Sequence, residues 1–568
     1  MEDRNHTKIE DQKDPLAGHL VALAILCGLM FFFGIGRLPL IGPDEPRYAE
    51  VAREMFLSGD WITPRLGGIN WFEKPALTYW LSAAGYKLFG VSEFSARFGI
   101  ALTSAAGVFL IYFFGRRIRS ARFGYLAASV LVTCGLWPAF ARGATFDLPV
   151  SVAMLLALLS FFVWEGDSEA AANGRNRFWW LFCFALGLAV LAKGLIGIVL
   201  PCAIVVAWLL ITRRLKIILS PFLLAVGTMI FLATAAIWYG PVIARHGRVF
   251  IDEFFIAHHF QRYLSNKYRH PQPVYFFILV VLAGSFPWLI YLCSGAWQTI
   301  KNWRERFDPV SDRWRIFLWL WVLIPVIFFS FSGSKLPGYI LPVFPAVAMI
   351  VALELEKWWD AAGTPKYLDW VAVTSAALIF VVAIFVALGG ERYFGMNLMQ
   401  SFTIAAIAIV TVVIYLFVWF LISGGAATNI LPFGIALILM ASISILSPVL
   451  SERESLRDLS LKAMELAQPG ERLVFYINQD NGINFYATDL PLRDERSELL
   501  TPMRPEKILK LMKDNKAESF LVLSRREWSE SLTYGGFLKV EQLGQQRQSV
   551  KCSPVCDWLL YRVRENLK

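Results

Sequence analysis

Residues 42–81 read GPDEPRYAEVAREMFLSGDWITPRLGGINWFEKPALTYWL and lie between the first two long apolar runs of the chain. The segment is too polar to span a bilayer, yet it is rich in Trp, Tyr, Phe and Leu. Apolar residues recur at helical spacing after Pro46 and again after Pro75. Proline suits the first turn of a helix, and the acidic residues Asp44 and Glu73 just ahead suit the positive end of the helix dipole. The pattern predicts two amphipathic helices on a membrane surface, each with a carboxylate at its start.

A simpler interpretation of these carboxylates is that Asp44 and Glu73 only cap the two helices. Capping accounts for one carboxylate per helix and leaves the neighbouring Glu45 and Lys74 unexplained. The distribution of charge in the rest of the chain is therefore needed to decide between capping and a functional role.

The composition places the chain in a membrane. Of its 568 residues, 57% are hydrophobic and 17% are charged, whereas about 25% of the residues of a soluble domain are charged. The net charge of +10 need not indicate a nucleic-acid partner, because the basic residues of a membrane protein mostly set its orientation. The apolar run at 19–41 is longer than about 20 residues and no small-x-small cleavage site follows it, so we expect it to remain as an anchor.

Apolar runs of spanning length occur about thirteen times, which predicts a polytopic α-helical membrane protein. They cover residues 19–41, 95–115, 122–139, 147–164, 178–193, 195–212, 218–240, 273–294, 314–331, 338–354, 368–388, 401–423 and 430–448. Three connecting loops are rich in basic residues and alternate correctly to share one face, which we interpret as cytoplasmic. These loops contain Arg116, Arg117, Arg119, Arg122, Arg213, Arg214, Lys216, Lys301, Arg304, Arg306, Arg313 and Arg315. With an odd number of spans, the chain beyond residue 450 lies on the outer face.

The tail of the chain has the character of a small soluble domain. LVFYIN, SFLVLS, LKVEQL and DWLLYRV are typical of strands, and EKILKLMKDN is typical of an amphipathic helix. We therefore expect a transmembrane domain over 1–449, with an outer first loop at 42–94, and an α/β domain over 450–568. Cys552 and Cys556 form the one close cysteine pair, which could be a disulfide in an oxidising compartment but lacks the further ligands of a zinc site.

Nearly every unusual polar group of the membrane part falls on the outer face. Burying such groups near membrane level costs free energy, so we interpret them as functional. They are Asp44, Glu45, Glu73, Asp147, Lys74, Arg142, Lys193, Arg262, Lys267, Arg269 and Lys335, with His258, His259 and His270 in a long loop. Together they predict a mixed-charge pocket. Its basic groups suit a phosphate, and its carboxylates suit base catalysis or binding of a cationic group. Lys335 and Arg142 could instead anchor at lipid headgroups, and Asp147 could cap a helix.

Several motifs resemble the protein O-mannosyltransferase superfamily of lipid-dependent glycosyltransferases. They are DEPRYAEVAREM, GDWITPRLGG, FEKPALTYWL, RGATFDLP, LAKG, HHFQRY and SGSKLPGYILP. Within the superfamily, the chain resembles the bacterial transferases of 4-amino-4-deoxy-L-arabinose to lipid A. The resemblance implies a type C glycosyltransferase fold in the inner membrane, with a periplasmic active site and a periplasmic C-terminal domain. It also implies an undecaprenyl phosphate-aminoarabinose donor, a lipid A acceptor and resistance to polymyxin-like peptides; nothing requires more than a monomer.

The resemblance also assigns site residues. Asp44, Asp147 and Glu73 match acidic positions of the superfamily and are expected to act in catalysis. The phosphate of the donor is assigned to Lys74, Arg47, Arg262, Tyr339, Lys193 and Lys335. Glu73 and His259 would form a metal site if a divalent ion such as Zn²⁺ or Mg²⁺ takes part.

Chemistry distinguishes two kinds of acceptor. A Ser or Thr hydroxyl would need a general base, and Asp44 would be that base. A phosphate monoester, with a second pKa near ~6, already carries a nucleophilic oxyanion, so Asp44 would position the acceptor or bind the amino group of the donor. In both cases a polyprenyl phosphate leaves and direct displacement inverts the anomeric centre.

Two alternatives stay open. One is a polyprenyl-phosphate-dependent transferase of another sugar or to another acceptor, such as a protein O-mannosyltransferase. The other is a transporter of lipid-linked sugar, although transporters usually carry their charges at mid-membrane rather than at the outer boundary.

Overall fold

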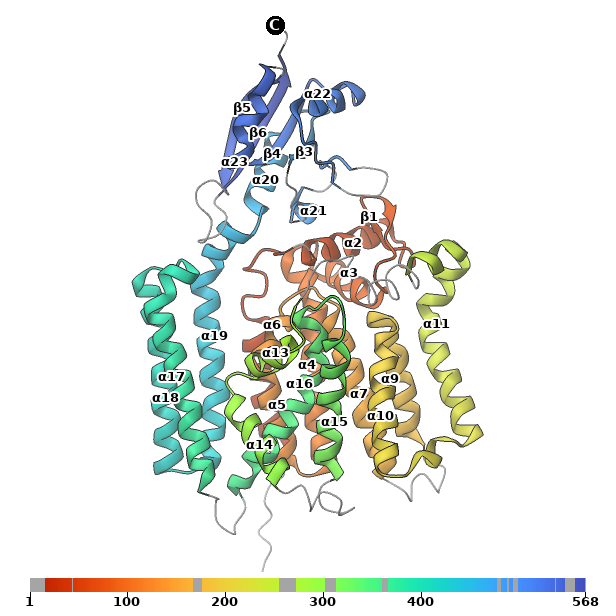
Figure 1. The fold of residues 1–568 in the computed structure, drawn as a ribbon, viewed down its shortest axis with the longest axis vertical. Helices are drawn as coiled ribbons and strands as arrows, with labels where there is room; N and C mark the ends of the chain where they lie inside the picture. The colour runs from red at the N-terminus through yellow and green to blue at the C-terminus, as the bar shows by residue number, and fades with distance from the viewer. Residues whose placement is uncertain are drawn as a thin grey trace, which may run out of the picture.

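Three layers follow one another along the long axis of the molecule in the computed structural model (Figure 1). A bundle of long helices forms the largest layer. Two shorter helices, α2 (Glu45–Ser58) and α3 (Leu77–Phe89), lie across one end of the bundle, and a small sheet lies beyond them. The structure describes residues 16–42, 44–166, 176–254, 272–301, 313–359, 366–477, 482–487, 490–493, 499–536, 538–546 and 557–566.

The bundle confirms a polytopic helical membrane protein. Its helices are α1 (Leu16–Cys27), α4 (Glu93–Ile118), α5 (Ala121–Thr133), α6 (Leu136–Ala141), α7 (Asp147–Gly166), α9 (Arg177–Lys193), α10 (Ile196–Ile211), α11 (Pro221–Ile251), α13 (Phe276–Gly284), α14 (Leu289–Lys301), α15 (Arg313–Ser330), α16 (Phe344–Glu356), α17 (Tyr367–Phe394), α18 (Leu398–Leu421) and α19 (Gly424–Glu454). Within the described ranges, eight helices are long and apolar enough to cross a membrane, or nine if a bent pair counts as one span. The expected number of thirteen is not confirmed.

The difference in number has two sources, because several apolar helices, such as α9 and α10, have fewer than 18 residues and other apolar runs are broken. The run at 273–294 forms α13 and α14, which are bent by 117° relative to each other. The run at 122–139 is divided between α5 and the short α6. Hydrophobicity alone does not show where a helix ends, so a run of spanning length need not be one straight span.

The two predicted first-loop helices are confirmed as α2 and α3, and α3 packs closely on α4. A Cβ atom at Gly99 of α4 would lie 2.5 Å from the carbonyl oxygen of Leu81. The Ser82 hydroxyl donates a hydrogen bond to the carbonyl oxygen of Ala96 at 2.7 Å. Small residues allow helix backbones to approach in this way. The first loop is therefore fixed to the bundle through its own second helix.

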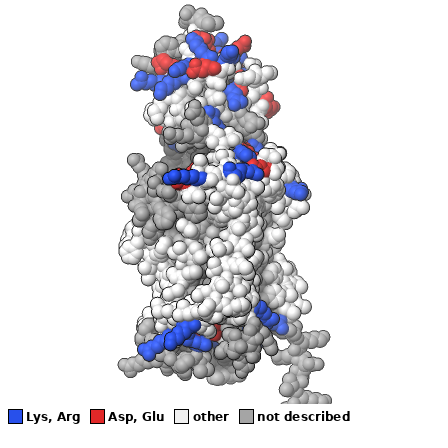
Figure 2. All heavy atoms as spheres, turned by 90° about the vertical axis from the view of Figure 1, so that its right-hand side faces the viewer, with Lys and Arg blue, Asp and Glu red and all other residues white. Residues whose placement is uncertain are grey.

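Ion pairs join the predicted cytoplasmic loops at the opposite end of the bundle. Glu165 is fully buried and pairs with both Arg214 and Arg313. Arg119 pairs with Glu356. Each of the three loops that the basic-residue pattern assigned to one face contributes an arginine to these ion pairs. Figure 2 shows charged side chains at both ends of the bundle and on the sheet, with an uncharged belt between the two ends.

The C-terminal sheet has four strands in the order β3-β4-β6-β5. They are β3 (Arg472–Tyr476), β4 (Ser519–Arg525), β6 (Trp558–Glu565) and β5 (Leu538–Gln546), and α20 (Arg457–Leu466), α21 (Ile483–Tyr486) and α22 (Pro505–Asp514) accompany them. β3 and β4 are parallel, as a crossover through α22 requires, and the other pairs are antiparallel. All four strands and the helix expected from the sequence are present. Cys552 and Cys556 lie outside the described residues.

Candidate active site

A cavity of about 630 Å³ opens where the first loop meets the outer end of the bundle. The first loop contributes one wall, and the start of α7, the turn between α9 and α10, the end of α15 and the 3₁₀ helix η5 (Pro337–Val343) contribute the others. Its polar lining includes Asp44, Tyr48, Glu73, Lys74, Asp147, Lys193 and Tyr339. Its apolar lining includes Phe140, Leu195, Ile196, Val199, Phe328, Phe329 and Leu336. The cavity thus combines charged groups with a long apolar wall.

Six of the site residues expected from the sequence line this one cavity, although they come from four separate parts of the chain. They are Asp44, Glu73, Lys74, Asp147, Lys193 and Tyr339. Arg47 is adjacent, with Nη1 3.7 Å from Asp44 Oδ1 and 3.7 Å from Glu73 Oε2. Lys335 is buried and directs its Nζ to the carbonyl oxygen of Ser332 at 2.7 Å.

The remaining expected residues belong to the long outer loop. Arg262, Lys267, Arg269, His258, His259 and His270 lie outside the described residues. The hypothesis of a metal site at Glu73 and His259 therefore stays a prediction. Within the described ranges, Glu73 is engaged by cations, since Lys74 Nζ lies 3.0 Å from its Oε1.

The capping interpretation of the two carboxylates does not match their contacts. Asp44 occupies the residue before α2, but its side chain accepts no capping hydrogen bond from the helix. Glu73 lies four residues ahead of α3, and its carboxylate pairs with Lys74 and Arg47. Both carboxylates line the cavity.

Two other charges predicted in the pocket have a structural role instead. Glu45 accepts hydrogen bonds from Arg97 Nε at 2.7 Å and from the backbone N–H of Ala144 at 2.9 Å. Arg142 donates to the carbonyl oxygen of Phe33 at 2.8 Å, beyond the end of the first helix. Neither side chain lines the described cavity. Both tie the outer ends of helices together: Arg142 gives a donor to a carbonyl group near the end of a helix, and Glu45 accepts from Arg97 and from a backbone N–H group.

Tyr48 adds a hydroxyl to the cavity wall without adding charge. Burial, assisted by the negative charges of Glu73 and Asp44, raises the pKa of Tyr48 well above its ordinary value. Its phenol therefore stays protonated at physiological pH and can donate a hydrogen bond to a ligand.

Asp147 and Lys193, which both line the cavity, form an ion pair. The Lys193 ammonium also lies 4.9 Å from the centre of the Tyr339 ring, a cation–π contact. Gly338 makes this arrangement possible, because a Cβ atom there would lie 2.6 Å from both Cγ and Oδ2 of Asp147. The sequence drew attention to Lys335 and Pro337 in this turn but not to Gly338, whose role depends on a neighbour nearly 200 residues away.

Gly338→Ala is expected to displace the Asp147 carboxylate and to reduce kcat/KM by about tenfold or more, because small misplacements in an active site are costly. The measurement is steady-state transfer by purified enzyme. Gly166→Ala, at the other end of α7, is the control because a Cβ atom there meets nothing within 4 Å. Equal activity of both variants would contradict the prediction.

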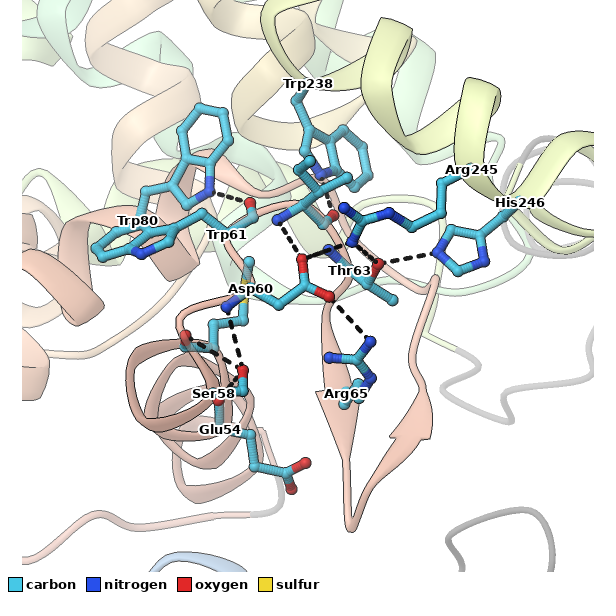
Figure 3. A network of polar contacts seen from close by, with 12 residues as sticks. Glu54, Ser58, Asp60, Trp61, Thr63, Arg65, Trp80, Trp238, Arg245 and His246 are labelled. Carbon is cyan, nitrogen blue, oxygen red and sulfur yellow. Dashed lines mark hydrogen bonds and ion pairs between the residues drawn. The ribbon is translucent and has the colours of Figure 1, made fainter.

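A second polar cluster at this end fixes α11 to the first loop (Figure 3). Asp60 Oδ1 accepts from Arg245 Nη1 at 2.8 Å, and Oδ2 accepts from Arg65 Nη2 at 2.9 Å. Trp238 of α11 donates from Nε1 to the carbonyl oxygen of Ile62 at 2.8 Å. The outer end of α11 is therefore held by the segment between α2 and β1 (Arg65–Leu66). No periodicity in the sequence indicated this contact.

Asp60 should contribute to stability in a pH-dependent way. Burial alone would raise its pKa, but backbone N–H groups and both arginines outweigh burial and lower the pKa to about 2. The contribution is therefore fully present above the unfolded pKa near ~4 and is lost as pH falls from there toward the folded value. Asp60→Asn is expected to destabilise the protein by about 1 kcal/mol at pH 7, with a smaller difference at pH 3. Thermal unfolding of both proteins at the two pH values measures this, and a pH-independent difference would contradict it.

Comparisons with known proteins agree with this architecture. A family model described as dolichyl-phosphate-mannose-protein mannosyltransferase matches residues 73–239. The undecaprenyl phosphate-alpha-4-amino-4-deoxy-L-arabinose arabinosyl transferase of Edwardsiella ictaluri (strain 93-146) is 33% identical over 337 residues, which are 59% of each chain. Arabinosyl transferase 1 of Pseudomonas fluorescens (strain Pf0-1) is 30% identical over 396 residues, 68% of this chain and 66% of that protein. The alignments thus span less than two thirds of the length of these relatives.

A solved structure extends the likeness to the whole fold. The crystal structure of ArnT from Cupriavidus metallidurans bound to undecaprenyl phosphate has a TM-score of 0.78, with 96% of this chain and 98% of that chain covered at 23% identity. At this identity the likeness establishes the type C glycosyltransferase fold. The chain is therefore a homologue of the undecaprenyl phosphate-aminoarabinose arabinosyl transferases and has the fold of their solved representative.

Proposed function

We propose that this protein transfers 4-amino-4-deoxy-L-arabinose from undecaprenyl phosphate to a phosphate of lipid A at the periplasmic face of the inner membrane. The modification would mask negative charge on lipid A and so confer resistance to polymyxin and other cationic peptides. The proposal follows the activity in the names of the relatives and agrees with the chemistry of the cavity.

The observation that carries the proposal is the composition of one cavity. Its polar end holds Lys74 and Lys193 beside three carboxylates, and its apolar side includes Val199 and Phe328. A polyprenyl-phosphate sugar needs cations for its phosphate, an apolar surface for its lipid and polar groups for its sugar. An amino sugar carries a positive charge, which suits a site rich in carboxylates.

The proposed reaction is a single displacement. An oxyanion of the lipid A phosphate attacks the anomeric carbon as the bond from that carbon to the undecaprenyl phosphate oxygen breaks, so the configuration is inverted. A phosphate monoester with a second pKa near ~6 is already ionised, and no proton needs to be removed from the acceptor. The bond electrons stay with the undecaprenyl phosphate, whose added charge the neighbouring cations stabilise.

Each side chain then has a distinct task. Lys74 and Lys193, with Arg47, Arg262, Tyr339 and Lys335 in support, hold the donor phosphate. Asp44 faces the reacting sugar, where it binds the amino group or stabilises positive charge at the anomeric carbon. Glu73 and Asp147 keep the flanking cations in place through their ion pairs.

Mass spectrometry of lipid A tests the proposal. The full chain is expressed in a polymyxin-sensitive Gram-negative host that lacks its own transferase, beside Asp44→Asn and the exposed control Asp514→Asn on α22. Lipid A is expected to gain one or two aminoarabinose groups with wild type and control, but not with Asp44→Asn. Unmodified lipid A from a well-expressed, membrane-inserted wild type would overturn the lipid A assignment.

Protein glycosylation is the second candidate, favoured by the match of residues 73–239 to a protein mannosyltransferase model. In that reaction Asp44 would act as the general base for a hydroxyl acceptor. Periplasmic glycoproteins of the same strains distinguish the two, because wild type would then modify protein and leave lipid A unchanged.

A further inference from the structure

The C-terminal sheet contacts the first loop through the short helix α21, which lies between the sheet and α2 (Figure 1). The Tyr486 hydroxyl accepts a hydrogen bond from the backbone N–H of Leu40 at 2.7 Å. The same hydroxyl donates to Glu93 Oε1 at 3.3 Å. Leu40 lies four residues before Asp44, so this contact fixes the chain just ahead of the cavity.

A second contact from α21 holds α2 on the other side of Asp44. Arg53 Nη1 donates to the carbonyl oxygen of Phe485 at 3.0 Å, and its guanidinium lies 5.6 Å from the centre of the Phe485 ring. Arg53 Nη2 pairs with Glu50 Oε1 at 2.6 Å. The side chains of Arg53 and Glu50 are only 11% and 6% exposed, so the contact excludes water.

Further contacts surround the same interface. Arg457 Nε, from α20, lies 3.3 Å from Glu93 Oε1. A Cβ atom at Gly67, in the turn between β1 and β2 (Ile69–Asn70), would lie 2.5 Å from Cδ of Arg493. Arg493 in turn donates to Asn484 Oδ1 at 2.7 Å. The first loop is therefore held by the tail at several points that are far apart in the sequence.

The contacts at Leu40 and Arg53 bracket the part of the loop that faces the cavity. Between them lie Asp44 and Tyr48, which line the cavity, and Arg47, which pairs with Asp44 and Glu73. A helix is stiff, so fixing α2 near its middle and the chain before its start also fixes the side chains between these points. Misplacement of reacting groups by about 1 Å can cost about 100-fold in rate.

We infer that α21 is a positioning element for the cavity: the Tyr486 hydroxyl and the backbone carbonyl group of Phe485 hold Asp44 and Arg47 in their working positions. The inference rests on the proposed function, because it assigns these two side chains a part in transfer. In this inference the C-terminal sheet supports transfer by positioning the first loop, and the sheet does not need to contact the substrate. Tyr486 and Arg53 are positioning residues, which act through α2.

Tyr486→Phe tests the inference by removing one hydroxyl, and Tyr476→Phe is the matched control. The Tyr476 hydroxyl, at the end of β3, interacts with Ser531 Oγ at 3.0 Å, within the C-terminal part of the chain and away from the first loop. Transfer is measured with purified folded enzyme and expressed per folded molecule. Tyr486→Phe is expected to lower kcat about tenfold, with KM for the donor within about twofold, because Lys74 and Lys193 lie outside the segment that moves and still hold the donor phosphate.

This measurement separates positioning from a purely structural role. The loss of a buried partner for Leu40 can lower the unfolding temperature in either case. If Tyr486 had only a structural role, Tyr486→Phe would keep the wild-type kcat per folded molecule, and that outcome would overturn the inference. The control Tyr476→Phe is expected to keep the wild-type kcat. Arg53→Met, like Tyr486→Phe, should lose activity, and Arg53→Lys should recover part of it.

A double-mutant cycle tests whether Tyr486 acts through Asp44. In the background of Asp44→Glu, whose carboxylate is already displaced, Tyr486→Phe should have a smaller effect than in wild type. Fully additive effects would count against the inference. An inactive wild type overturns the proposed function and the inference with it, whereas an active wild type with a fully active Tyr486→Phe overturns the inference alone.

Discussion

Asp44→Asn is expected to lower kcat about 100- to 1,000-fold without loss of folding. The carboxylate lines the cavity, its side chain is 49% exposed, and it makes no capping bond to α2. Positive charge builds up at the anomeric carbon during glycosyl transfer, and a carboxylate held beside that carbon stabilises the charge. Asparagine keeps the size of the side chain and one acceptor oxygen but removes its charge.

The choice of asparagine also separates catalysis from capping. Asparagine and aspartate are about equally good at the start of a helix, so a residue that only capped α2 would tolerate the change. The measurements are kcat with a lipid-linked donor and thermal unfolding in detergent. A variant that keeps nearly full activity would show that the charge of Asp44 is not used in transfer.

Arg97→Met is expected to destabilise the protein by about 3–5 kcal/mol, because it leaves the buried carboxylate of Glu45 without its charged partner. Arg97 is 2% exposed, and it joins Glu45 to the carbonyl oxygens of Leu38 and Pro39 at 2.6 and 2.8 Å. Its removal also leaves those carbonyl groups without donors. Thermal unfolding and the yield of folded protein measure the effect.

Arg248→Met is the matched control for this prediction. Arg248 is 91% exposed and pairs with Asp252 at 3.6 Å, a geometry that contributes little to stability. The double variant Glu45→Gln/Arg97→Met should be more stable than Arg97→Met alone, because it removes the unpaired buried charge. Similar stability of Arg97→Met and Arg248→Met would contradict the assigned role of Arg97.

Much of the fold could be predicted because a bilayer restricts what a chain can do. That restriction determines the length of the apolar runs, the side of the membrane on which the basic loops lie and the helical period of the first-loop helices. The places where helices break could not be predicted in the same way. The bend between α13 and α14 lies within a continuous apolar run, and its position depends on the packing of neighbouring helices.

The candidate site was predictable to a similar extent. A charge at membrane level marks a position that needs a partner, and five residues selected on this basis line one cavity, together with Tyr339 from the resemblance. The nature of the partner was not predictable, since Glu45 and Arg142 have partners inside the protein. Arg97 was missed because it lies within an apolar run, and Gly338 was missed because close approach becomes visible only in three dimensions.

The ion pairs of the cavity have a consequence for selectivity. Three carboxylates, Asp44, Glu73 and Asp147, accompany three cations, Arg47, Lys74 and Lys193, in and beside the described cavity. Among these described side chains the charges offset each other, and an arriving phosphate must exchange partners with the neighbouring carboxylates. Free phosphate and ordinary headgroups gain little from such an exchange, so the long tail of the donor has to supply the free energy. Affinity for the donor should consequently vary little with salt concentration, because few ions are displaced to bulk water.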